Sequence, residues 1–383
     1  MIQFFGVVML GVVLMLTTVC IVMLLSGCSA ADEGAGAPQT TGSALVFSVT
    51  EGTTRAPQGT TRAPRGTMTL DGNDGTESLK DKGFGVFACH TGAHPYVSTS
   101  ASANLMWNQL VTYNNTENAW EYAPLVYWPN DDGEAEQYVT FFAYAPHSTQ
   151  ANGCIADMSR PEEKGDPWIL YQLGGTSEAE GANGWKAQQV DLLYDFKKDK
   201  KREYPIASNK IDFGFKHALA SIGDQITVGV GESVAERLKA LYDGSPVTLT
   251  VSTITIDYLL TRKGRLVLNN NGQPNWQAVE SEDSKVHRLL TFTPNLVMAQ
   301  ATSASACTTS SFVSEAGQGV LYIPLESGAG KQKVTISAQY TVATDGNDGV
   351  ISDGTIETTL DLSYISNASE GHNLNITIQI PDI

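Results

Sequence analysis

The chain has 383 residues, of which 24 are basic and 41 acidic, and its formal net charge is −17. That length suits about two domains of ~100–200 residues each. The negative charge argues against nucleic acid as a partner, because phosphate binding needs a basic surface, and against electrostatic docking on anionic lipid. It is typical of a secreted or cell-surface protein that is kept soluble by charge.

Residues 1–27 carry no charged side chain and are apolar almost throughout. This run is either an uncleaved membrane helix or an export signal. The residues Leu25-Ser26-Gly27-Cys28 favour a signal, because they resemble the bacterial lipobox, whose cysteine is acylated and becomes the new N-terminus. The resemblance implies a lipid anchor on Cys28, which two or three acyl chains would hold stably in a bilayer. The plain alternative is a cysteine at a helix end, and the run departs from the signal pattern in having no basic residue before it.

A short apolar segment, Leu-Val-Phe-Ser-Val at 45–49, is the first strand that the sequence predicts. Residues 29–44 before it are small and polar and have the composition of a flexible tether. The alternation of a strand places three apolar side chains on one face, namely Leu45, Phe47 and Val49. A lone strand between two stretches of loop composition is unusual for part of a core.

The stretch at 53–66, Thr-Thr-Arg-Ala-Pro-Gln-Gly-Thr-Thr-Arg-Ala-Pro-Arg-Gly, nearly duplicates a seven-residue unit. It contains every basic residue that precedes Lys80, namely Arg55, Arg62 and Arg65. Proline and glycine keep such a backbone open and accessible. The plain interpretation is a solvated linker with chance charges, and the duplication favours a specific role.

From residue 84 the chain is a series of short runs rich in Val, Ile, Thr, Tyr and Phe, separated by turn residues, as in β-sandwiches. Among them are predicted strands at 84–89, 122–129 and 138–146. The last run has the clearest alternation, with Leu374, Ile376, Ile378 and Ile380 on one face and Asn375, Thr377 and Gln379 on the other.

One segment, 232–244, is rich in helix formers and stops at a glycine, so it is predicted to be a helix. The fold class is therefore mostly β, with one or two short helices. The predicted division is 1–27 signal peptide; 28–66 tether, first strand and arginine segment; 67–205 N-terminal domain, completed by strand 45–49; and 206–383 C-terminal domain.

Motifs for catalysis and cofactor binding are absent: the sequence has no nucleophile elbow, P-loop, dinucleotide fingerprint or zinc-protease helix. Cys89, His90 and His94 are close in sequence, but they lie where a strand runs into a loop, and a loop is the favoured interpretation. The sequence Asp-Gly-Asn-Asp-Gly occurs at 71–75 and 345–349 without the glutamate that a calcium loop needs, so turns are predicted there. We therefore predict no catalytic, cofactor-binding or metal site, and no enzyme.

Three cysteines remain after the signal and the lipobox, Cys89, Cys154 and Cys307, and whether two of them pair is left open. Six tryptophans invite a glycan-stacking interpretation, but core and rim packing is the favoured one.

Several segments together resemble the fimbrillin-like lipoprotein pilins of Bacteroidales. One is the Tyr-Trp-Pro that ends the run at 122–129, followed by a polar hairpin and an aromatic run closing on Ala-Tyr-Ala-Pro. Later come Val-Asp-Leu-Leu-Tyr-Asp-Phe at 190–196 and Ile-Asp-Phe-Gly-Phe-Lys-His-Ala-Leu at 211–219. No single motif is specific, but their order and spacing cover most of the chain.

This resemblance implies two transthyretin-like β-sandwiches and export as an outer-membrane lipoprotein that then assembles into a surface pilus. It further implies an Arg-specific protease that cuts after Arg55, Arg62 or Arg65 and so removes the lipid and the first strand. The vacated groove would accept a strand from another pilin subunit, in place of Leu45, Phe47 and Val49. No cofactor is implied.

The C-terminus departs from the family pattern, because stalk pilins carry extra donor strands there and this chain ends three residues after Ile380. Either the strands at 355–363 and 374–380 are the donors, or this subunit accepts a strand and gives none, as a tip or accessory pilin would. A third option is an anchor that stays lipidated. The alternative from another class is a monomeric outer-membrane lipoprotein that binds a glycan or another host ligand.

Overall fold

The computed structural model describes residues 43–50, 68–71, 77–129, 137–147, 154–172, 190–202, 210–261, 263–269, 274–279, 285–315, 319–325, 332–344, 349–362 and 373–380. All of them belong to one compact unit, Gly42–Ile383. This part of the chain is mostly β, with two short helices, α1 (Leu79–Lys82) and α3 (Glu232–Ala240). The predicted fold class is therefore confirmed.

A six-stranded sheet forms the centre of the N-terminal half. Its order is β12-β10-β7-β4-β5-β6. The strands are β4 (Phe84–Gly92), β5 (Met106–Asn114), β6 (Ala119–Glu121), β7 (Tyr138–Ala145), β10 (Leu193–Lys200) and β12 (Lys216–His217). Both faces of β4 and β7 are covered, because Phe84 and Phe141 belong to one buried cluster while Phe87 and Phe142 belong to another. This explains why both strands are apolar almost without interruption.

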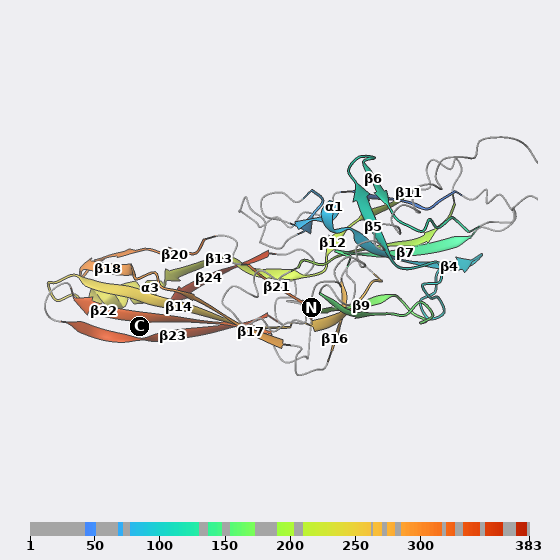
Figure 1. The fold of residues 1–383 in the computed structure, drawn as a ribbon. Helices are drawn as coiled ribbons and strands as arrows, with labels where there is room; N and C mark the ends of the chain where they lie inside the picture. The colour runs from blue at the N-terminus through green and yellow to red at the C-terminus, as the bar shows by residue number, and fades with distance from the viewer. Residues whose placement is uncertain are drawn as a thin grey trace, which may run out of the picture. The chain divides into compact units, whose positions relative to one another are not determined.

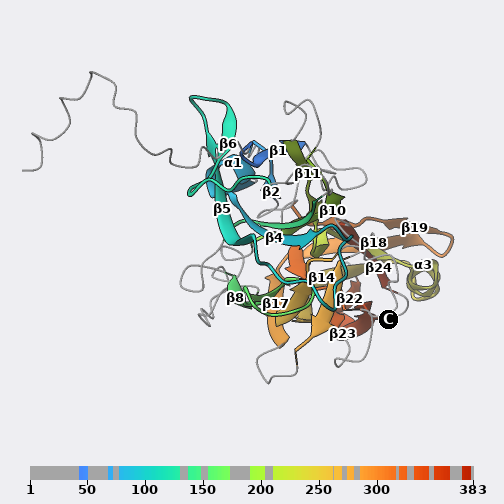
Figure 2. The same cartoon turned by 90° about the vertical axis from the view of Figure 1, so that its right-hand side faces the viewer.

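One face of this sheet is covered by short elements from distant parts of the chain, which together with it make the front sandwich (Figure 2). They are β1 (Val46–Thr50) paired with β11 (Lys210–Gly214), β2 (Met68–Thr69) paired with β3 (Glu77–Ser78), and α1. Ser78 caps the N-terminus of α1, because its hydroxyl accepts a hydrogen bond from the backbone N–H of Asp81.

The other face packs on a four-stranded sheet of order β16-β15-β9-β8. Its strands are β8 (Ile155–Met158), β9 (Trp168–Gln172), β15 (Lys263–Val267) and β16 (Asn275–Ala278). Because β9 pairs with β15, strands from both sides of residue 205 share this sheet. The domain boundary near 205 stays a prediction.

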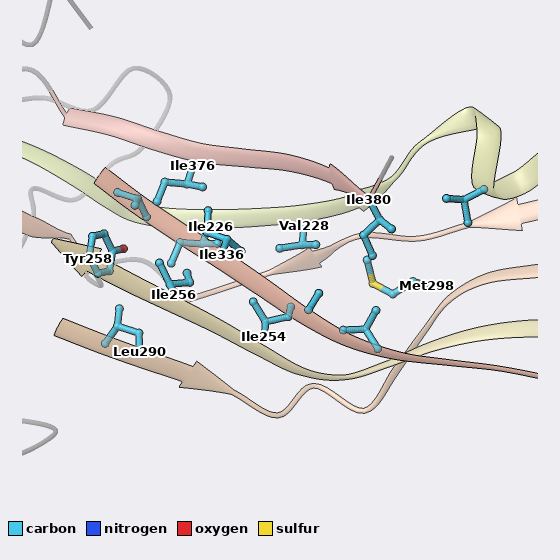
Figure 3. Close-up of a cluster of buried hydrophobic side chains, with 14 of the residues drawn as sticks. Ile226, Val228, Ile254, Ile256, Tyr258, Leu290, Met298, Ile336, Ile376 and Ile380 are labelled. Atoms are coloured by element: carbon cyan, nitrogen blue, oxygen red, sulfur yellow. The ribbon is translucent and has the colours of Figure 1, made fainter. Parts of the chain in front are cut away.

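The rear sandwich consists of two sheets around the largest buried cluster (Figures 1 and 3). In one sheet β13 (Ala220–Val230) pairs with β20 (Phe312–Val313), β21 (Val320–Tyr322) and β24 (Asn373–Ile380). The other sheet contains β14 (Val247–Thr261), β17 (Lys285–Phe292), β18 (Leu296–Ser303), β19 (Ala306–Thr309), β22 (Lys333–Thr344) and β23 (Val350–Asp361). Figure 3 shows Ile226 and Ile376 facing Ile254 and Ile336 across this core.

Local patterns predicted several elements correctly. Ile376 and Ile380 of β24 are buried while Asn375 and Gln379 are exposed, as the alternation required. The predicted helix is present but ends at Ala240 rather than 244, with Leu241 at its C-cap.

The predicted strand at 122–129 was wrong. The segment has no ladder and makes only an isolated bridge, Ala44 with Tyr127. Pro124 and Pro129 cannot donate a backbone hydrogen bond, so a regular strand is disfavoured there.

Gly223 gives a test of how tightly the rear sandwich is built. Its φ is +76°, and an added Cβ would lie 2.5 Å from the hydroxyl oxygen of Tyr258. We expect Gly223→Ala to lower the free energy of unfolding by about 2–4 kcal/mol, because backbone strain and crowding add.

The matched control is Gly244→Ala, where φ is also positive, +117°, but nothing lies within 4 Å of the new Cβ. It should cost only about 1 kcal/mol. Urea unfolding measures the free energy of unfolding of both variants. Equal losses of this free energy would show that crowding against Tyr258 adds nothing to the cost.

Candidate functional site

The strand β1 is inserted in a groove of the front sandwich. It pairs in parallel with β11, with Phe47 opposite Ile211 and Val49 opposite Phe213. Leu45 and Phe47 are 1% and 2% exposed, whereas Val46 between them is 45% exposed. Leu45 and Phe47 therefore point into the core, as the strand alternation predicts. Val49 is half-buried against the same core.

The opposite edge of β1 is held as well. The backbone N–H of Leu45 donates to the carbonyl of Val126 over 2.9 Å, and the N–H of Trp128 donates to the carbonyl of Ser43 over 3.0 Å. The hydroxyl of Tyr122 lies 3.0 Å from the carbonyl oxygens of both Leu45 and Val126. Burial raises the pKa of Tyr122, so this hydroxyl keeps the proton that it donates. The segment 122–129 is therefore the second wall of the groove, although it is not a strand.

Phe47 occupies the centre of the groove. Its ring stacks on Phe213 at 5.8 Å between centroids and lies edge-on or tilted to the rings of Phe84, Phe141 and Tyr122 at 6.3, 6.1 and 5.3 Å. These four rings come from three strands, β4, β7 and β11, and from the segment 122–129, so the position is defined by residues that span 84 to 213. Burial of a large apolar side chain stabilises by about 1.5–3 kcal/mol, so Leu45 and Phe47 together contribute several kcal/mol to holding β1.

The chain that follows the arginine segment is held by a hydrogen bond that does not involve β1. Met68 is buried in the same core, and its backbone N–H donates to Oδ2 of Asp191 over 3.3 Å. The same oxygen lies 2.6 Å from Nδ1 of His217, and both of these side chains are buried. Asp191 and His217 lie in the two segments that carry the family resemblance, but sequence reasoning assigned them no role. A buried charge needs a partner, and the local pattern could not show which one it has.

Several predicted site residues lie outside the described residues: Cys28, Arg55, Arg62 and Arg65. The lipidation and cleavage sites therefore stay predictions. Within the described ranges, no helix has the length and hydropathy needed to cross a membrane.

The residues that the structure describes form no metal site, and their cysteines are not paired. No three His, Cys, Asp or Glu side chains in those ranges form a group that could hold a metal ion. Cys89, Cys154 and Cys307 are free thiols, and burial raises the pKa of Cys89 and Cys154 to about 12, which keeps both protonated.

The described tryptophans all have intramolecular contacts. Trp107 donates to the Ser159 carbonyl, Trp276 to the Ala218 carbonyl and Trp168 to Glu163, while Trp120 and Trp128 pack on Phe84 and Phe141. Their packing accounts for them without a glycan.

A stability comparison tests whether β1 is part of the core. Phe47→Ala should lower the free energy of unfolding of the uncut chain by about 3–5 kcal/mol, because it leaves a cavity among four rings. Val46→Ala on the exposed face should cost less than about 1 kcal/mol. Chemical denaturation measures both, and a Phe47 variant as stable as the Val46 variant would contradict the described packing.

The chain was compared with known families and structures. The family model described as fimbrillin-like matches residues 61–379. A fimbrial protein from Bacteroides vulgatus superimposes with a TM-score of 0.56 at 19% identity, covering 88% of this chain and 95% of that one. The fimbrial anchor protein Mfa2 from Porphyromonas gingivalis gives a TM-score of 0.30 at 8% identity, with 81% of each chain covered. No curated protein matches the sequence.

Proposed function

Because the chain belongs to the fimbrillin-like family, we propose that it is a non-enzymatic subunit of a cell-surface fimbria that takes part in adhesion. It is exported as an outer-membrane lipoprotein anchored through Cys28 and matures by losing β1. The vacated groove then receives a strand from another pilin subunit. The family supports a fimbrial role, a surface location and a structural rather than catalytic protein.

The observation that carries the proposal is the way β1 is held. Its covalent connection to the rest of the described chain runs through residues 51–67, and all three candidate arginines lie in that segment. A cut after Arg55, Arg62 or Arg65 would leave β1 bound by non-covalent contacts alone. Met68 would keep its own anchor on Asp191, so the downstream chain would stay in place.

The groove that remains would suit a strand from another subunit. Loss of β1 exposes the free edge of β11 on one side and the carbonyl of Val126 and the N–H of Trp128 on the other. An incoming strand with large apolar side chains two residues apart would refill the positions of Leu45 and Phe47 and satisfy both edges. This recovers the buried area that cleavage gives up.

The C-terminal strands support a subunit that accepts a strand and donates none. Here β23 pairs with β22 and β24 pairs with β13, both within the rear sandwich of the same chain. Donating β24 would uncover Ile376 and Ile380, which are buried in that core. A tip or accessory position is therefore favoured over a stalk position. The alternative of a monomeric glycan-binding lipoprotein has no comparable support, because the described tryptophans have contacts within the chain, although Trp107 remains 38% exposed.

Treatment of the purified chain with an Arg-specific protease tests this function. We expect cleavage within residues 55–66, release of the β1 fragment on gel filtration under native conditions, and capture of strands from partner pilins by the cut chain. The control is the triple variant Arg55→Lys, Arg62→Lys, Arg65→Lys, which keeps the charge but removes the scissile residues. It should stay intact and monomeric. Intact mass and native gels report both, and a cut chain that keeps β1 and its full stability would refute the proposal.

A further inference from the structure

The indole N–H of Trp128 has no hydrogen-bond acceptor among the residues that the structure describes. Trp128 is 2% exposed, and its Nε1 atom is buried. An indole nitrogen can only donate, and a buried donor without an acceptor is costly, so folded proteins leave few of them. Three other described tryptophans, Trp107, Trp168 and Trp276, each donate this N–H to an oxygen. Trp128 therefore needs a separate explanation.

Trp128 lies beside the first residues of the inserted segment 43–50. Its backbone N–H donates to the carbonyl of Ser43 over 3.0 Å, and next to this contact Ala44 and Tyr127 form an antiparallel bridge. Ser43 is therefore the residue opposite Trp128, and opposed residues of an antiparallel pair have side chains on the same face. That face is the inner one, because Leu45 comes two residues after Ser43 and is buried in the cluster that contains Trp128.

Ser43 does not supply the missing acceptor. Its hydroxyl oxygen is buried as well and has no hydrogen-bond partner in the described part of the chain, so these two opposed polar side chains are not bonded to each other. Farther along the same segment, Ser48 donates to Oδ1 of Asp212 over 2.7 Å. The inserted segment therefore leaves two polar side-chain atoms unsatisfied at the Trp128 end of the groove.

We propose that Trp128 selects the strand that replaces β1 by favouring a hydrogen-bond acceptor at the position of Ser43. The best acceptor is the amide oxygen of glutamine or asparagine, because these side chains reach farther than serine and a carboxylate costs more to desolvate. An incoming strand of this kind satisfies a donor that the inserted segment leaves unsatisfied, so the exchange gains free energy at this position. The inference rests on the proposed function, since only a chain that exchanges β1 can use this selection.

The first arm of the test uses the uncut full chain and involves no exchange. Ser43→Gln is compared with Ser43→Met, which is similar in length and has no amide oxygen. Both changes are made in the wild-type chain and in the Trp128→Phe chain, which lacks the indole N–H, and urea unfolding then gives a double-mutant cycle. We expect the equilibrium constant for folding to be about tenfold larger for Ser43→Gln than for Ser43→Met in the wild-type chain, and about equal for the two in Trp128→Phe.

The second arm measures the exchange itself. Fluorescent peptides of residues 42–50, with the natural sequence, with Ser43→Gln or with Ser43→Met, are titrated into chain that has been cut within the arginine segment. We expect the Ser43→Gln peptide to bind about tenfold more tightly than either of the others. This advantage should be lost when the cut chain carries Trp128→Phe. The comparison between peptides requires no change in the protein, so it holds even if Trp128→Phe folds poorly.

The outcomes separate this inference from the proposed function. If the natural peptide binds the cut chain and Ser43→Gln gives no advantage, or one that persists in Trp128→Phe, selection by Trp128 is overturned while the exchange stands. Equal stability of the Ser43→Gln and Ser43→Met chains would also overturn it, since the N–H would then already have an acceptor such as a bound water. If no peptide binds the cut chain, the exchange is refuted, and selection by Trp128 is refuted with it.

Discussion

A single aromatic side chain, that of Phe47, organises the front of this protein. It comes from the five-residue strand β1, and its four ring neighbours come from strands and a loop that extend to residue 213. The backbone on either side of it pairs with β11 and with the segment that ends at Trp128. The front sandwich is thus completed by a piece of chain that has no local partner. That constraint makes β1 part of the front core although its pairing partners are distant in the sequence.

Most of the remaining structure has packed cores that do not include β1. The six-stranded sheet is covered on both faces, and the face away from β1 packs on strands β8, β9, β15 and β16. The backbone N–H of Met68 is held by Asp191, which in turn contacts His217. Loss of β1 would therefore open one groove without dismantling the second buried cluster or the rear sandwich, each of which has its own packed side chains.

Local sequence patterns predicted much of this fold, because strand alternation and helix composition are local properties. The inward positions of Ile376 and Ile380 and the face shared by Leu45 and Phe47 follow from spacing, and the helix from Glu232 follows from composition. Pairing between distant segments is not local. No periodic pattern in the sequence indicates the parallel pairing of β1 with β11. The same holds for the sheet that joins β9 to β15 and for the buried Asp191–His217 pair. The run at 122–129 was misjudged because its apolar content suggested a strand while its prolines prevented one.

The central claim is that β1 fills a groove which an exogenous strand can refill, and peptide complementation tests it most directly. A labelled peptide of residues 44–50 would be titrated into the uncut chain and into chain cut after the arginine segment and freed of β1. The account predicts saturable binding to the cut form only, strongly weakened when Phe47 in the peptide is replaced by alanine. Equal binding to both forms, or none to the cut form, would contradict it.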